Sequence, residues 1–183
     1  MTAVATAGWL LIIGSVIFLV GAGIGVPRIW TEPDPQVRLR MLRERRVIWV
    51  VAQPFYGLGA LVAGVGVGLL AGDDAGASLF VVGAAALVVG ALAWGWSLYL
   101  RATRIDDFVA GRHPGWPFMT YVLLTIAGLA LLGAGLLMAG FPAWLGWFTL
   151  GADLLFLLAY VWFKDIPPFF FYLLLLLVGA VLL

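Results

Sequence analysis

Residues 118–139 read FMTYVLLTIAGLALLGAGLLMA, a stretch that contains no charged side chain. An α-helix rises 1.5 Å per residue, so a helix over this stretch is about 33 Å long. That length is enough to cross the hydrocarbon core of a bilayer, which is about 30 Å thick. The stretch therefore predicts a transmembrane helix.

Five other stretches have the same apolar character, and they lie at residues 8–26, 47–70, 78–100, 144–163 and 167–183. The last of them is only just long enough to cross a membrane as a helix. Hydrophobic residues make up 64% of the chain and the mean hydropathy is +1.14, far outside the range of water-soluble proteins. We therefore expect an all-α, multi-pass bundle of about six transmembrane helices that forms a single domain over residues 1–183.

The cationic side chains lie in three connecting segments that are separated by even numbers of predicted helices. They are Arg28, Arg38, Arg40, Arg43, Arg45 and Arg46, then Arg101, Arg104 and Arg112, then Lys164. Cationic loops stay in the cytoplasm, so we expect both termini, the Asp73-Asp74 turn and the Phe141-Pro142 turn outside, in a bacterial-type plasma membrane. The first stretch is expected to be a retained helix and not a signal peptide, since residues 1–7 carry no cationic side chain.

A weak internal repeat is visible when the chain is shifted by 68 positions. The shift places nine residues between Leu69 and Trp94 on identical residues between Leu137 and Trp162. This pattern favours a parallel duplication of a helical hairpin. Membrane segments are built from few residue types, so such matches also arise by chance.

Asp153 is the most informative residue, because it lies near the middle of the fifth stretch and therefore near the bilayer midplane. Charge is costly there, so an unpaired carboxyl group is expected to be protonated and to donate a hydrogen bond. One interpretation is a proton-relay or solute-binding group that faces the bundle interior. The other is a neutral Asp that bridges two helices.

Depth, counted at 1.5 Å per residue from the cytoplasmic ends, selects possible partners for Asp153. The side chains expected at comparable depth are Tyr56, Ser15 and Thr125, and Thr149 lies one turn away on the same helix. Gln53-Pro54 is a second polar irregularity, because Pro54 removes a backbone hydrogen bond. Gln53 either lines a cavity with Tyr56 or satisfies the broken backbone, and the second interpretation is favoured.

The arginine-rich segment at residues 27–46 has a net charge of +3 beside the membrane. Candidate ligands for anionic lipid headgroups are Arg38, Arg40, Arg43, Arg45 and Arg46. Topology alone requires the same charges, and this simpler explanation is preferred. A second charged cluster at residues 101–113 is interpreted as a solvated helix end with local ion pairs, with phosphate binding as the alternative.

Several functional classes lack the residues they need. The chain has no Cys and a single His, His113, so thiolate chemistry, a Ser-His protease and a bis-His haem are excluded. Lys164 lies at a helix end, where it cannot form a midplane retinal Schiff base. We expect no cofactor, no metal site and no nucleic-acid partner.

These observations favour a non-enzymatic accessory or scaffold subunit of a larger membrane assembly, with lipids and other membrane subunits or further copies of itself as partners. The first alternative is a small carrier of a solute or of protons, in which Asp153 is the coupling group and Gln53 and Tyr56 line the path. The second is a lipid-modifying enzyme that uses the charged cluster at residues 101–113.

Overall fold

The computed structural model describes residues 2–72 and 75–183, so the expected Asp73-Asp74 turn lies outside the described residues. The described part is all-α, as the sequence predicts. Five helices are long and apolar enough to cross a membrane, which makes the chain a multi-pass membrane protein. They are α1 (Ala3–Ile24), α3 (Arg46–Gly68), α4 (Ala77–Thr103), α6 (Trp116–Met138) and α7 (Ala143–Phe163).

The sixth predicted stretch forms a shorter helix, α8 (Phe169–Val181), of 13 residues. At 1.5 Å per residue it is about 20 Å long, and it cannot cross a core of about 30 Å as a helix. Pro167 and Pro168 precede it and delay its start. Five of the six predicted spans are therefore supported by their length, and the sixth forms a shorter apolar helix.

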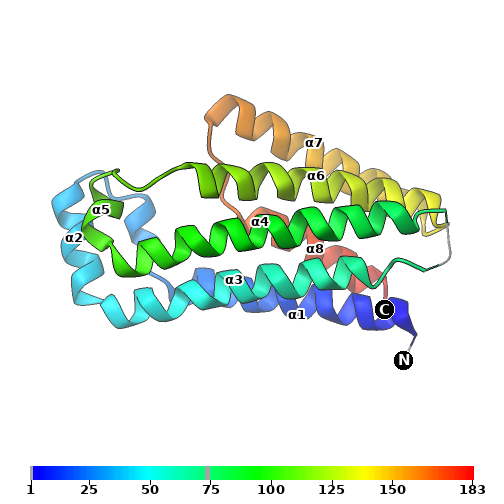
Figure 1. The fold of residues 1–183 in the computed structure, drawn as a ribbon, viewed down its shortest axis with the longest axis horizontal. Coiled ribbons are helices and arrows are strands. Elements are labelled where there is room, and N and C mark those ends of the chain that lie inside the picture. Colours follow the sequence, from blue (N-terminus) through cyan, green and yellow to red (C-terminus); the bar gives the residue numbers. More distant parts are fainter. Residues whose placement is uncertain (1, 73–74) are drawn as a thin grey trace.

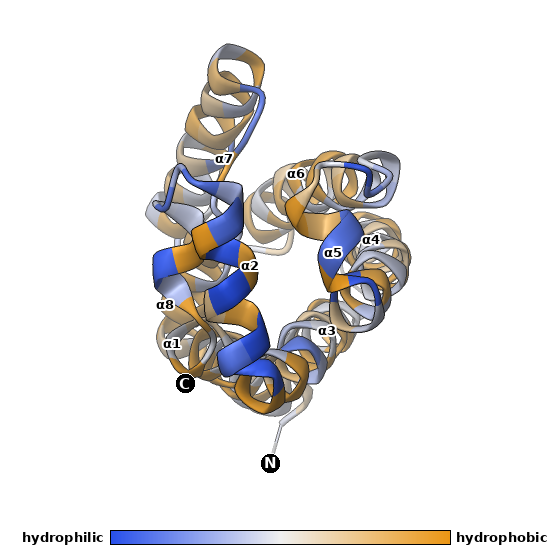
Figure 2. Cartoon of the chain, turned by 90° about the vertical axis from the view of Figure 1, so that its left-hand side faces the viewer, coloured by the Kyte–Doolittle hydropathy of each residue, from blue (hydrophilic) through white to orange (hydrophobic). Residues whose placement is uncertain are grey.

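The helices follow one another around a ring (Figure 2), in the order α1, α3, α4, α6 and α7. The short helix α8 packs against α1, so helices that are far apart in the sequence are neighbours in the ring. The contact between α7 and α8 is slight by comparison. The ring is consequently tight along most of its circumference and loose between α7 and α8.

The two ends of the bundle differ in composition. The N- and C-termini lie near each other at one end, which we call the terminal end (Figure 1). The opposite end, which we call the basic end, carries η1 (Pro27–Trp30), α2 (Pro35–Glu44) and α5 (Ile105–Val109). Helix α2 begins as the sequence predicts, since Asp34 caps it by accepting a hydrogen bond from the Gln36 amide and Pro35 occupies its first turn.

Glycines hold the long helices close together. A Cβ atom at Gly59 of α3 would lie 2.6 Å from the carbonyl oxygen of Gly14 in α1, and one at Gly179 of α8 would lie 2.8 Å from the carbonyl oxygen of Gly8. Such close backbone approach increases the van der Waals contact that drives helix association in lipid. These contacts fix α1 between α3 and α8.

The proposed hairpin repeat is not matched by the burial of its residues. Its matched residues occupy different environments: Trp94 is 2% exposed whereas Trp162 is 83% exposed, and Phe80 is buried whereas Phe148 is exposed. Identical residues therefore face the protein core in α4 and the surroundings in α7. The structure gives no support to a duplicated unit.

Candidate functional site: polar groups inside the helix ring

Aromatic side chains from five helices meet inside the ring, and we call this group the aromatic layer. Its members are Phe18 of α1, Tyr56 of α3, Trp94 of α4, Tyr121 of α6 and Tyr172 of α8. The rings of Phe18 and Tyr172 stack with centroids 3.7 Å apart, and those of Trp94 and Tyr121 stack at 4.3 Å. Tyr56 joins them edge-on, 5.1 Å from Phe18. These side chains fill the centre of the ring at this depth.

One hydrogen bond crosses the aromatic layer. The buried hydroxyl of Tyr121 donates to the hydroxyl of Tyr172 over 3.1 Å and so connects α6 to α8. Because each tyrosine also stacks on a second ring, both side chains are fixed in position.

Three polar side chains lie one helical turn further toward the terminal end, and we call them the polar layer. Ser15 precedes Phe18 by three positions, Thr125 follows Tyr121 by four, and Asp153 precedes Phe156 by three. Phe156 belongs to the same level of the bundle, since its ring contacts that of Phe171, the neighbour of Tyr172. Residues three or four apart share a helix face, so all three polar side chains face inward at a similar depth.

The polar layer is buried and its hydrogen bonds are incomplete. Ser15, Thr125 and Asp153 are 0%, 2% and 5% exposed. Among the residues that the structure describes, their oxygens Oγ, Oγ1 and Oδ1 find no hydrogen-bond partner. The indole Nε1 of Trp94 in the adjoining aromatic layer also lacks one. Buried polar groups are normally satisfied by protein or by internal water, so this region is chemically suited to hold a small polar species.

Two of the other predicted site residues have partners of their own. The Thr149 hydroxyl donates to the carbonyl oxygen of Leu145 over 2.8 Å, within its own helix. The Gln53 amide nitrogen Nε2 donates to the carbonyl oxygen of Trp49 over 2.9 Å, one position before the carbonyl that Pro54 leaves free. Gln53 therefore stabilises the backbone near the proline.

Gln53 and Tyr56, expected to line one path, lie in different places. Gln53 lines a groove of about 370 Å³ between α3 and α4, together with Pro54 and Tyr99. Tyr56 instead belongs to the aromatic layer. The structure thus places Ser15, Thr125 and Asp153 in one layer, with Tyr56 in the next, and sets Gln53 apart.

Arg101 at the basic end is a feature that the sequence interpretation missed. Its guanidinium carbon lies 5.6, 5.3 and 5.5 Å from the ring centroids of Trp30, Phe108 and Phe118. Its backbone carbonyl accepts a hydrogen bond of 3.0 Å from the indole of Trp49. Arg101 follows the buried Trp94 by seven positions, and this spacing on one helix face is the signal that separates it from the solvated charges nearby.

The arginines proposed to bind lipid headgroups lie in or just after α2. Arg40, Arg43, Arg45 and Arg46 are exposed, whereas Arg38 is partly buried. Arg43 also pairs with Asp106 at 2.6 Å, and this ion pair connects α2 to α5 at the basic end. Among the residues of the second charged cluster, Asp107 pairs with Arg112 at 2.8 Å and Arg104 is exposed.

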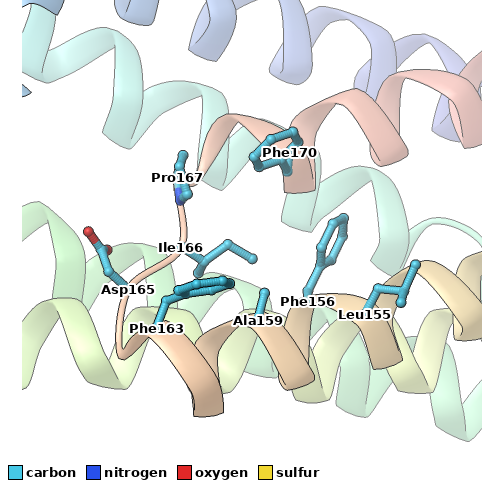
Figure 3. Close-up of a pocket in the computed structure, with 8 residues that line it drawn as sticks. All are labelled: Leu155, Phe156, Ala159, Phe163, Asp165, Ile166, Pro167 and Phe170. Carbon is cyan, nitrogen blue, oxygen red and sulfur yellow. The ribbon is translucent and has the colours of Figure 1, made fainter. Parts of the chain in front are cut away.

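An apolar cleft of about 500 Å³ opens between α7 and the start of α8 (Figure 3). We call it the α7–α8 cleft, and its lining residues are Leu155, Phe156, Ala159, Phe163, Asp165, Ile166, Pro167 and Phe170. Asp165 stands at its edge, apart from the apolar side chains. The cleft exists because α7 leans away from the ring toward the basic end (Figure 1).

No family model, curated protein or solved structure matches the chain.

Proposed function

We propose that this protein is an accessory or scaffold subunit of a larger membrane assembly and that it binds a transmembrane helix of another protein along residues 154–163 of α7. The observation that carries the proposal is the position of this segment, which leans out of the ring (Figure 2) and faces the surroundings on most of its circumference.

Helix α7 is the least buried of the five helices that are long and apolar enough to cross a membrane. Seven of its ten residues are exposed large hydrophobics, namely Leu154, Leu155, Leu157, Leu158, Val161, Trp162 and Phe163. At 100° per residue they cover about 240° of the helix surface. A second helix packed on this segment would bury apolar and aromatic area that the chain itself leaves uncovered.

The α7–α8 cleft gives such a partner a place to insert side chains. Its volume of about 500 Å³ matches a few large apolar residues, too little for a whole helix. A partner helix therefore lies along the opening and places individual side chains into it. Helix association in lipid depends on this kind of shape match, because the apolar surfaces gain little from leaving lipid.

Site-specific crosslinking in native membranes tests the proposal. A photo-crosslinking amino acid replaces Leu158 of α7, which is 55% exposed, and Leu92 of α4, which is 60% exposed, serves as the matched control. We expect a discrete adduct with another protein at position 158 and none at position 92.

Equal adducts at the two positions, or lipid adducts alone at position 158, would contradict the proposal. An adduct of twice the chain's own mass would show a second copy of this protein and replace the accessory role with self-association.

A second candidate function, a small carrier, is favoured by the unpaired oxygens of the polar layer. A carrier predicts that Asp153→Asn abolishes uptake while the fold is retained, whereas an accessory subunit predicts that co-purifying partners are unaffected. The lipid-modifying alternative has weaker support, since Arg104 and Asp107 line neither of the two grooves described above.

We also propose the plasma membrane as the location of the protein, with the basic end in the cytoplasm. The positive-inside rule supports this orientation, because η1, α2, α5 and the charges between them lie at one end.

A further inference from the structure

We propose that Asp153, Ser15 and Thr125 form a buried binding site for one exchangeable proton, which resides on the Asp153 carboxyl group. The site is independent of the assembly role proposed for α7.

The three side chains are assigned to one site because all three are buried and lie at a similar depth on helices that line the ring. Each lies one turn from an aromatic residue of the same level, and that level is fixed by ring contacts between α1, α6, α7 and α8. The carboxyl oxygen Oδ1 of Asp153 and the two hydroxyl oxygens are buried without partners in the described part of the chain. A carboxylic acid can donate to a hydroxyl or to a bridging water, and each hydroxyl can accept that bond and donate another.

The surroundings favour the proton-loaded form of the carboxyl group. Helices α1, α6 and α8 contain no charged residue, and Asp153 is the one charged residue of α7. The titratable groups on the elements around it are Tyr121 of α6 and Tyr172 of α8, whose hydroxyls bond each other, and Tyr160 on α7 itself. A carboxylate here would lack a counter-charge in a low-dielectric interior, whereas the neutral acid needs only hydrogen bonds.

Proton release would change the hydrogen bonding of the whole layer. The carboxylate left behind can only accept, so the two hydroxyls must turn to donate toward it, and any internal water must do the same. The proton itself leaves to water, and no other bond is made or broken. Binding and release of the proton are thus coupled to a reorientation of the hydroxyl groups of Ser15 on α1 and Thr125 on α6.

Infrared difference spectroscopy tests this site without knowledge of the physiological function. The full-length protein in nanodiscs is compared between mildly acidic and alkaline buffer, and the carbonyl band of a protonated carboxylic acid is followed. We expect this band to be lost at alkaline pH, to be absent from Asp153→Asn, and to persist in the control Asp165→Asn, whose carboxyl group is exposed at the end of α7.

Hydroxyl variants report on the shared site even where Asp153→Asn does not fold. Ser15→Ala and Thr125→Val are expected to shift the band, because the carboxyl group loses a hydrogen-bonding neighbour in each. An unchanged band in both variants, or a band that does not respond to pH, would overturn the proposal. Loss of the band in sodium but not in potassium buffer at constant pH would identify Na⁺ as the ligand in place of the proton.

Discussion

The ring of Phe18 stacks on the ring of Tyr172 with centroids 3.7 Å apart and planes inclined by 14°. This pair joins α1, the first long helix, to the short helix α8, and the Tyr172 hydroxyl extends the connection to Tyr121 of α6. Since α8 packs mainly on α1, Tyr172 and its neighbour Phe171, whose ring contacts those of Tyr121 and Phe156, link it to the opposite side of the ring.

Two variants of Tyr172 are therefore expected to destabilise the bundle to different extents. Tyr172→Phe keeps the stacked ring but leaves the Tyr121 hydroxyl without its partner, at a cost of about 1 kcal/mol. Tyr172→Ala also removes the ring and is expected to cost about 3–5 kcal/mol. Thermal unfolding in detergent measures both, and Tyr99→Phe on the exposed face of α4 is the control. A Tyr172→Ala protein with the same melting temperature as the wild type would contradict this expectation.

Gly59 is expected to tolerate no side chain. Its Cβ would lie 2.6 Å from backbone atoms of Gly14 and Phe18, so Gly59→Ala must push α1 and α3 apart and lose about 1–3 kcal/mol. Gly95→Ala is the matched control, because a Cβ there meets nothing within 4 Å. On helix propensity alone that control is neutral or stabilising by up to about 1 kcal/mol. Equal melting temperatures for the two variants would show that the glycine contact does not limit packing.

His113 is expected to make stability depend on pH. Burial, together with the nearby charge of Arg101, lowers the pKa of His113 below its usual 6.5, although its ring also bonds the carbonyl of Ser97 at 3.2 Å. The unfolded chain then holds more protons than the folded protein in the window below 6.5. Stability therefore rises with pH across that window. His113→Gln should remove this contribution in melting curves recorded at several pH values, and an unaltered slope would refute it.

The absence of cysteine makes the orientation easy to test, since each introduced cysteine can be labelled alone. Arg40→Cys and Ala110→Cys at the basic end are expected to react only with a reagent applied from the cytoplasm. Ala75→Cys and Ala143→Cys at the terminal end are expected to react only from outside. Labelling of Arg40→Cys and Ala75→Cys from the same side would contradict the predicted topology, which places these two positions on opposite sides of the membrane.

The sequence predicts the long helices well, because apolar length and helix-breaking residues are local signals. The predicted stretch 144–163 corresponds to α7 at Ala143–Phe163, and 118–139 corresponds to α6 at Trp116–Met138. The shortness of α8 was not foreseen, since Pro167 and Pro168 take up the start of an apolar stretch that was counted as one span.

Helix order and rotation could not be read from the sequence, because apolar residues cover every face of these helices. Depth is simpler, and counting residues from the helix ends places Ser15 and Asp153 at one level, where the structure also has them. The direction in which a side chain points could not be predicted in this way. Gln53 and Tyr56 are three positions apart, but Gln53 lines an outer groove and Tyr56 belongs to the aromatic layer. The sequence interpretation grouped Arg101 with its charged neighbours. Arg101 packs against aromatic rings, whereas Arg104, less than one helical turn further on, is exposed, and the sequence alone does not show this difference.

The pairing of α1 with α8 has a consequence for biogenesis. The first of the long helices leaves the ribosome well before α8, and until then Phe18 lacks the ring of Tyr172 that stacks on it. A 13-residue segment is also a poor substrate for insertion on its own. Its entry into the bilayer is therefore expected to depend on the surface of α1 that the earlier steps of folding have already placed in the membrane.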